Sequence, residues 1–267
     1  MTALDPARRD ADARASRHVL RELGFATNRA GDGLEGTAVV APPLLVPGVP
    51  RLRTSVLFTW ADTMGGLLAV RSFAPRVPVT LELDVHLRRP APGDGTVRGV
   101  ASVVKAGRSV FVFEAEFSSE EDEGFAVAAG SFMASPDPGV SMPTRIPPAQ
   151  PPSDTLRVPL AERVGCVRRG PGESVLPRLE DGLNSSNTVN GGLIALAAEE
   201  AVLSLAPGTT LSSLALRYLQ PVRVGPAVAT AEVSDGFGRV RIRDAGSGDR
   251  LAVLATTRTF PGPPGRD

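Results

Sequence analysis

Two apolar stretches decide the fold of this chain of 267 residues. The first reads Thr54-Ser-Val-Leu-Phe-Thr-Trp-Ala-Asp-Thr-Met-Gly-Gly-Leu-Leu-Ala-Val70, and the second reads Gly191-Gly-Leu-Ile-Ala-Leu-Ala-Ala-Glu-Glu-Ala-Val-Leu-Ser-Leu205. A helix that is apolar on nearly all sides is buried, so both are predicted to form central helices. Each stretch is interrupted by one acidic site, and strand-like sequence follows each of them. A repeat on this scale indicates a duplicated domain.

The strand-like sequence alternates in the way that half-buried strands do. In Val79–Leu87 the alternation predicts Leu81 and Leu83 on the buried face and Thr80 on the opposite face. Further strands are expected at residues 34–46, 96–104, 109–117 and 125–133, and in the second half at 211–219, 227–234, 239–245 and 251–260. The predicted class is therefore α+β, a double hotdog in which each half wraps an antiparallel sheet around a central buried helix.

The predicted organisation follows from this repeat. We expect an N-terminal helix in residues 1–23, a first hotdog domain in 24–134, a proline-rich linker in 135–158, a second hotdog domain in 159–261 and a tail in 262–267. Seven of the twenty residues from 135 to 154 are proline, so the linker should be extended and semi-rigid.

Composition excludes several functional classes. The formal net charge is zero, so neither nucleic acid nor a membrane surface is expected as a partner. Cys166 is the only cysteine, which excludes an internal disulfide and fits a reducing compartment. The N-terminal residues lack the apolar core of a secretion signal, and the apolar runs are too short to cross a bilayer. A cytoplasmic protein is expected.

The acidic sites are the first candidates for chemistry. Asp62 is the only charged residue between Thr54 and Val70, and Glu199 and Glu200 interrupt the second apolar stretch. A carboxylate in a buried helix is costly unless it is paired or functional, and burial raises its pKa. Each acid is therefore a candidate base or nucleophile, or else it faces a solvated groove or pairs with an arginine. Glu200 could replace Glu199, since the helix phase is uncertain by one residue.

The sequence around these acids resembles a known family. The run Asn184-Ser-Ser-Asn-Thr-Val-Asn-Gly-Gly192 is followed by Glu199 seven residues later, and Asp62 follows Ser55 by the same spacing. This is similar to the hotdog-fold acyl-CoA thioesterases of the phenylacetyl-CoA (PaaI-like) branch, which have a Gly-Thr-Val-His-Gly-Gly turn and an Asp seven residues after it. The likeness covers most of residues 24–134 and 160–260.

Each half keeps a different part of the family motif. The histidine position holds Asn190 in the second half and Arg53 in the first, and the glycine pair survives only in the second half. The resemblance implies that a site forms across the interface of two units. The implied intact site has Asp62, Asn184, Asn190 and Gly191 as catalytic residues. The implied opposite site, which looks degenerate, has Glu199, Arg53 and Thr54.

These residue types suit thioester hydrolysis. Gly191 at a helix start offers a bare N–H and the positive end of the helix dipole to an oxyanion. Asp62 can act as a base on water or attack directly, and Asn184 or Asn190 can hold the water or the carbonyl. The competing interpretation of the Asn-Gly-Gly turn is an ordinary helix N-cap.

Four further residues are candidate substrate contacts. They are Trp60 and Gly192 for the acyl group, and Lys105 and Arg108 for the phosphates of coenzyme A. The competing interpretations are a core role for Trp60 and solvated charges at a sheet edge for Lys105 and Arg108.

The sequence thus predicts a hydrolase of a small or medium acyl-CoA, with a non-catalytic acyl-CoA-binding or scaffold protein as the alternative. No metal and no cofactor are expected, because no His/Cys/Asp cluster has ligand spacing. The family habit also allows a homo-oligomer of double-hotdog units.

Overall fold

One antiparallel sheet of twelve strands runs through both halves of the chain, as a computed structural model of residues 18–137, 139, 142 and 156–261 shows. The strand order is β1-β2-β4-β5-β6-β3-β9-β12-β11-β10-β8-β7. Counted outward from the central pair β3 and β9, the strands of the two halves correspond one to one: β6 to β12, β5 to β11, β4 to β10, β2 to β8 and β1 to β7. The predicted α+β class, with a sheet around a central helix, is confirmed.

The first half contributes α2 (Val19–Glu22), β1 (Ala26–Ala30), β2 (Gly33–Val39), η1 (Pro42–Leu44), α3 (Thr54–Phe73), β3 (Pro78–Leu87), β4 (Thr96–Ala106), β5 (Phe111–Ser119) and β6 (Ala126–Ala134). The second contributes α4 (Leu160–Arg163), β7 (Val167–Gly170), β8 (Glu173–Leu176), η2 (Glu180–Gly182), α5 (Gly191–Leu205), β9 (Leu211–Tyr218), β10 (Ala227–Ser234), β11 (Phe237–Asp244), η3 (Ala245–Ser247) and β12 (Arg250–Thr259).

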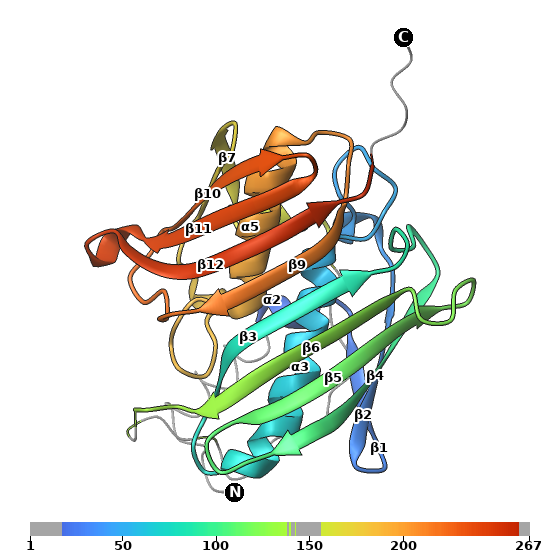
Figure 1. The fold of residues 1–267 in the computed structure, drawn as a ribbon, viewed down its shortest axis with the longest axis vertical. Coiled ribbons are helices and arrows are strands. Elements are labelled where there is room, and N and C mark those ends of the chain that lie inside the picture. The colour runs from blue at the N-terminus through green and yellow to red at the C-terminus, as the bar shows by residue number, and fades with distance from the viewer. Residues whose placement is uncertain (1–17, 138, 140–141, 143–155, 262–267) are drawn as a thin grey trace, which may run out of the picture.

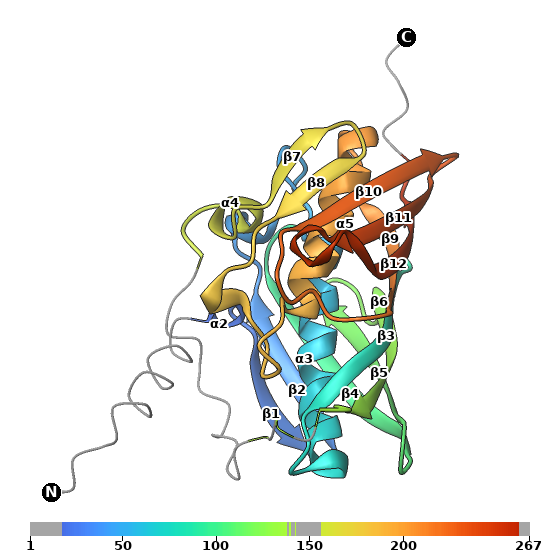
Figure 2. The same cartoon turned by 90° about the vertical axis from the view of Figure 1, so that its left-hand side faces the viewer.

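The sheet curls around the two long helices. Figure 1 shows α3 and α5 behind the strands, one in each half, and Figure 2 shows β1 and β2 on the other side of α3 and β7 and β8 on the other side of α5. The halves join where β3 pairs with β9, with Leu83 opposite Leu216 and Val85 opposite Leu214. All four side chains are buried, so the seam belongs to the hydrophobic core.

Some of the strand predictions need correction. The strand expected at residues 34–46 ends at Val39, because prolines begin a 3-10 turn at Pro42–Leu44. The sequence prediction missed β1, β7 and β8, which are only four or five residues long.

Parts of the predicted organisation lie outside the described residues. These are residues 1–17 of the expected N-terminal helix, most of the linker and the tail at 262–267. Val19–Glu22 forms a single helical turn.

A β-bulge changes the face on which Thr80 lies. The pairing of β3 with β6 shifts register between Thr80 and Glu82, and the hydroxyl of Thr80 donates a hydrogen bond to Asp62 on α3. The prediction that Thr80 lies opposite the buried face is therefore wrong. A bulge inserts one extra residue, here Leu81, and reverses the alternation beyond it.

Two adjacent glycines in α3 differ in their surroundings. A methyl group on Gly65 would lie 2.4 Å from Phe113 Cε1, whereas on Gly66 the nearest described atom would be Phe132 Cε1 at 3.9 Å. Packing therefore requires glycine at the first position and leaves room at the second.

This difference predicts opposite effects of two alanine substitutions. Gly65→Ala should lower the free energy of unfolding by about 1–3 kcal/mol through overpacking against Phe113. Gly66→Ala should raise it by about 0.5–1 kcal/mol, because alanine is the better helix former. Urea unfolding of both variants measures this, and equal effects would contradict the packing difference.

Candidate active site

The carboxylate of Asp62 lies beside the N-terminus of the other central helix. Its Oδ1 accepts a hydrogen bond of 2.8 Å from Thr80 Oγ1. A methyl group added to Gly191, the first residue of α5, would lie 3.5 Å from Asp62 Oδ2 and 2.7 Å from the hydroxyl oxygen of Tyr218. The structure thus places Asp62 close to Gly191, the arrangement that the family resemblance implies. Asp62, Thr80, Gly191 and Tyr218 are all partly exposed.

This environment changes the acidity of both titratable groups. Burial raises the pKa of Asp62 to about 6, against the opposing effect of the hydrogen bond from Thr80. Burial, and then the charge of Asp62, raise the pKa of Tyr218 well above its usual value. At neutral pH Asp62 is therefore ionised but is a much better proton acceptor than an ordinary aspartate, and Tyr218 is a neutral donor.

Hydrogen bonds fix the first turn of α5. Tyr218 Oη donates to the carbonyl oxygen of Gly191 over 3.0 Å, and the Gly192 N–H of the same peptide group donates to Asn190 Oδ1 over 2.8 Å. Asn190 is thus the N-cap of the helix. The Gly191 N–H has no hydrogen-bond partner among the residues that the structure describes, which leaves it as a donor for a ligand.

Asn184 organises the loop before α5. Its Oδ1 accepts from the Ser186 N–H, the Thr188 N–H and the Thr188 hydroxyl. Because the oxygens of Asn184 and Asn190 are both occupied by the protein, neither can accept a hydrogen bond from an attacking water as readily as expected. The structure does not show Asn184 in contact with Asp62.

A second carboxylate occupies the equivalent place in the other half. Asp62 is the ninth residue of α3, and Glu199 is the ninth residue of α5. Glu199 Oε1 accepts from the Thr54 N–H at 2.9 Å and the Ser55 N–H at 3.4 Å, and its Oε2 accepts from Ser55 Oγ at 2.6 Å. Glu199 therefore accepts hydrogen bonds from the first N–H groups of α3. At the start of α5, in contrast, the Gly191 N–H has no partner among the described residues.

An arginine closes this second site. Arg53 Nη1 lies 3.3 Å from Glu199 Oε2 and 2.6 Å from Glu200 Oε1, and all three side chains are buried. Arg168, at the surface, pairs with the other oxygen of Glu200 over 2.7 Å. The structure thus brings together Glu199, Arg53 and Thr54, and the predicted alternative of pairing with an arginine holds for both glutamates.

The structure gives the four predicted substrate contacts other surroundings than a ligand. Trp60 is 1% exposed and stacks on Phe25 with ring centroids 5.1 Å apart, so it has the core role. A methyl group on Gly192 would lie 2.2 Å from Thr59 Oγ1, so close helix packing explains this glycine. Lys105 is the penultimate residue of β4 and Arg108 lies on the turn that follows. Both are exposed, and the structure shows no contact of either with the site.

Sequence reasoning missed Thr80 and Tyr218. Tyr218 is the only tyrosine in the chain and lies at the end of a predicted strand, which was the one available signal. Thr80 gave none, because the bulge cannot be seen in the alternation.

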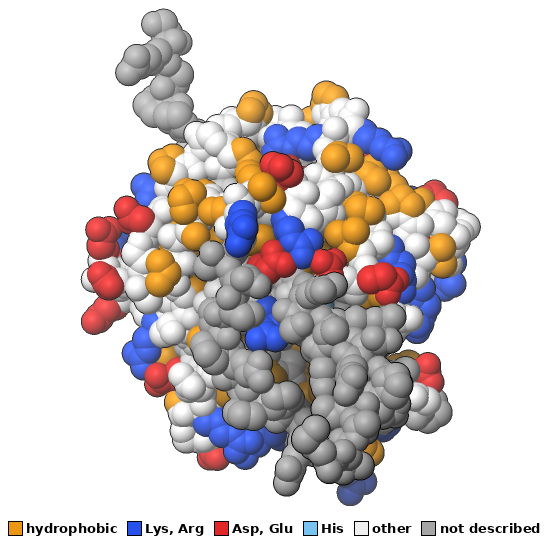
Figure 3. Space-filling model, turned by 180° about the vertical axis from the view of Figure 1, so that it is seen from behind, with side chains coloured by type: hydrophobic (Ala, Val, Ile, Leu, Met, Phe, Trp, Pro, Cys, Tyr) orange, Lys and Arg blue, Asp and Glu red, His pale blue; other side chains and the backbone are white. Residues whose placement is uncertain are grey.

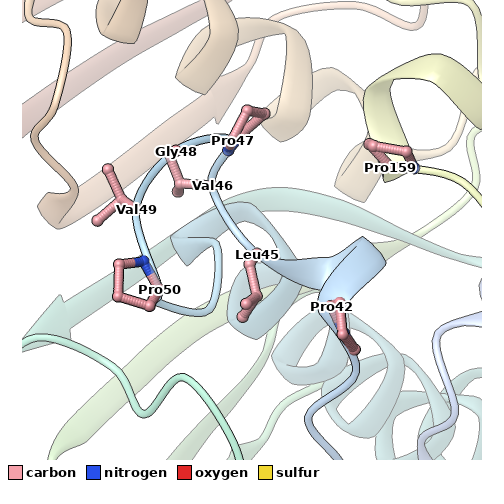
Figure 4. A pocket seen from close by; sticks show the side chains of 8 residues that line it. All are labelled: Pro42, Leu45, Val46, Pro47, Gly48, Val49, Pro50 and Pro159. Carbon is pink, nitrogen blue, oxygen red and sulfur yellow. The ribbon is translucent and has the colours of Figure 1, made fainter.

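Other features of the described residues offer no competing centre. A hollow of about 390 Å³ is lined by apolar loop residues (Figure 4): Pro42, Leu45, Val46, Pro47, Gly48, Val49, Pro50 and Pro159. It lacks any titratable side chain. Among the described residues, no group of His, Cys, Asp and Glu could hold a metal ion, and no helix is long and apolar enough to span a bilayer.

Comparison with known proteins agrees with this geometry. Residues 54–126, which contain α3 and Asp62, match the family model of the thioesterase superfamily. This match covers part of the first half, which is therefore similar to the thioesterase superfamily, and the fold of the chain is a hotdog fold. The similarity supports a thioester hydrolase. Curated protein sequences gave no match.

Solved thioesterases share the fold of the whole chain at low identity. The 12:0-ACP thioesterase from Umbellularia californica is 13% identical, with a TM-score of 0.64 over 88% of this chain and 99% of that one. An acyl-ACP thioesterase from Bacteroides thetaiotaomicron is also 13% identical, with a TM-score of 0.58 over 90% and 99%. The match to nearly the full length of both neighbours shows that they, too, contain both halves of the fold.

The raised pKa of Asp62 predicts a pH-dependent effect of Asp62→Asn on stability. The folded state holds the proton up to about pH 6, whereas the unfolded chain releases it near pH 3.8, so ionisation destabilises the fold as pH rises through this window. Relative to the wild type, Asp62→Asn should gain about 2 kcal/mol of unfolding free energy between pH 4 and pH 7. Urea unfolding at several pH values measures this, and a difference that does not change with pH would refute it.

The buried ion pairs predict a large effect of Arg53→Met. Removing the guanidinium leaves two buried carboxylates without their main partner, which should cost about 3–5 kcal/mol of unfolding free energy. Arg168→Met is the matched control, since Arg168 is 38% exposed and Glu200 would keep Arg53. Chemical denaturation compares the two, and a similar loss in both would show that Arg53 has no special role.

Proposed function

We propose that this protein hydrolyses an acyl-CoA thioester at a single site formed by Asp62 from the first half and the N-terminus of α5 from the second. One observation carries the proposal. Asp62 Oδ2 lies 3.5 Å from the methyl position of Gly191, whose N–H has no partner among the described residues, and the opposite site is filled by an arginine.

The geometry supports a hydrolytic sequence. The thioester carbonyl oxygen accepts a hydrogen bond from the Gly191 N–H at the positive end of the helix dipole. Asp62 removes a proton from a water, whose oxygen adds to the carbonyl carbon. The tetrahedral intermediate then breaks its C–S bond, and the proton held by Asp62 passes to the departing thiolate. The products are a carboxylic acid and a free thiol.

Tyr218 and Asn190 hold the turn in place for this chemistry. The hydroxyl of Tyr218 and the cap oxygen of Asn190 bind the two ends of the Gly191–Gly192 peptide group. With its oxygen engaged, the side chain of Asn190 has only its amino group left to donate to a substrate oxygen. Both residues act by positioning the first turn of α5.

Acyl carrier protein is the second candidate carrier, because the two solved neighbours are named as acyl-ACP thioesterases. Coenzyme A is favoured here by the resemblance of the sequence around Asp62 and Gly191 to acyl-CoA thioesterases. Figure 3 shows basic, acidic and hydrophobic side chains interspersed over the described part of one face.

Thiol release from acetyl-, phenylacetyl- and dodecanoyl-CoA and from dodecanoyl-ACP tests the proposal. Wild type should release thiol, and its kcat/KM should rise with pH and level off above about pH 6 as Asp62 ionises. Asp62→Asn should lower kcat/KM by about 10²–10⁴-fold. Glu199 and Glu200 cannot take over, because both are engaged by Arg53.

Asp84→Asn is the matched control. Asp84 lies on the same strand as Thr80 and pairs with Arg217, so its loss should leave kcat/KM within about twofold. Faster thiol release from dodecanoyl-ACP than from dodecanoyl-CoA would show that acyl carrier protein, and not coenzyme A, is the preferred carrier. Binding of the CoA thioesters without thiol release would instead support the non-catalytic binding protein.

A further inference from the structure

The helical turn α2 reaches across to the loop in front of α5 through a histidine. His18, the N-cap of α2, accepts a hydrogen bond from the Leu20 N–H at its Nδ1 over 3.2 Å. Its Nε2 lies 2.7 Å from the carbonyl oxygen of Leu183, a residue of the other half. Burial lowers the pKa of His18, against the opposing effects of the hydrogen bond to Leu183 and of two nearby carboxylates, so the ring is neutral at neutral pH. With Nδ1 as the acceptor, the single ring proton is on Nε2, and His18 donates to Leu183.

Leu183 lies at the base of the loop that carries the candidate oxyanion donor. The preceding residue, Gly182, accepts a hydrogen bond of 3.0 Å from the Asn190 N–H at the far end of the loop. Asn190 is the N-cap of α5, and the next N–H along the chain is that of Gly191. The two ends of the loop are thus bound to each other, and the hydrogen bond from His18 holds the base on which the Gly191 N–H is mounted.

Ion pairs fix α2 itself. Arg163 on α4 donates to both carboxylate oxygens of Glu22, the last residue of α2, over 2.8 and 2.6 Å, and its Nη2 also donates to Asp181 Oδ2 on η2 over 2.7 Å. All three side chains are partly buried. Bidentate pairs of this kind add geometric specificity as well as energy. His18 therefore reaches Leu183 from a helical turn that is bound to the same part of the second half.

The equivalent place before α3 has an apolar surface instead. α4 stands before β7 as α2 stands before β1, and its N-cap is Pro159, whose side chain cannot donate. Leu45 follows η1 as Leu183 follows η2, and Pro159 and Leu45 both line the apolar hollow of Figure 4. The loop before the helix start that Glu199 fills thus faces a hollow, whereas the loop before the open helix start is bound by a histidine.

We propose that His18 is a positioning residue of the candidate active site, which holds the loop at Leu183 so that the Gly191 N–H stays in place for the thioester oxyanion. An oxyanion donor lowers the barrier only where it meets the developing charge, and a displacement of about 1 Å can cost much of its effect. This inference rests on the proposed function and adds to it a residue that acts through the loop rather than on the substrate.

Two substitutions separate the tie to Leu183 from the capping of α2. His18→Asn keeps an acceptor near the position of Nδ1 and is a good N-cap, but its side chain is too short to reach Leu183. His18→Gln can place an amide N–H near the position of Nε2. In His18→Asn kcat for thiol release should fall at least about tenfold with KM within about twofold, because the donor acts in the transition state, whereas in His18→Gln kcat should stay within about threefold of wild type.

Pro159→Ala is the matched control from the other half, and it should leave kcat and KM within about twofold of wild type. The opposite order of the two His18 variants, with kcat kept by His18→Asn and lost by His18→Gln, would show that His18 only caps α2 and would overturn the inference.

A measurement without turnover separates this inference from the proposed function. Amide hydrogen exchange over residues 183–192 should be at least about tenfold faster in His18→Asn than in wild type, and unchanged in His18→Gln. This result would support the tie even if no thioester were cleaved. Exchange at the wild-type rate in His18→Asn would overturn the inference, and so would faster exchange together with an unchanged kcat.

Discussion

Each central helix presents a carboxylate to the N-terminus of the other, and the rest of the arrangement depends on this exchange. A buried helix start leaves N–H groups without partners and carries partial positive charge. A carboxylate from the neighbouring helix can accept hydrogen bonds from these N–H groups and balance the partial positive charge. The close approach of Gly192 to Thr59 brings the helix starts near enough for the exchange, and the β3–β9 seam holds the two halves in register.

The two helix starts differ in how the carboxylate from the other helix is bound. At α3 the acid is buried, accepts both backbone N–H groups and is neutralised by Arg53. At α5 the carboxylate of Asp62 accepts a hydrogen bond from Thr80. Among the described residues the Gly191 N–H has no partner, so it can bind a ligand. The first solution stabilises the fold and the second permits chemistry. Two identical subunits related by symmetry would have to adopt the same solution twice, whereas a single chain with two halves need not.

The fold was largely predictable from sequence, because apolar helices and strand alternation are local patterns. The pairing of Asp62 with Gly191 was implied by the resemblance to a family whose sites form across the interface of two units, and spacing alone would not have given it. The positions that escaped prediction depend on long-range geometry. Thr80 reaches Asp62 only through a bulge, and Tyr218 reaches Gly191 from a strand 27 residues away. Trp60 and Gly192 were assigned to a ligand because sequence cannot tell what each side of a buried helix packs against, which is Phe25 for Trp60 and the partner helix for Gly192.

The continuous sheet has a consequence for how the two halves can exist. In the part of the chain that the structure describes, the two edges of the sheet are β1 and β7, both of which are short. If the halves were separated, β3 and β9 would each expose a long row of unpaired backbone groups beside buried leucine and valine side chains. Exposed edges of this kind recruit other strands and drive aggregation. Keeping both halves in one polypeptide therefore favours the pairing of β3 with β9 over pairing with other strands.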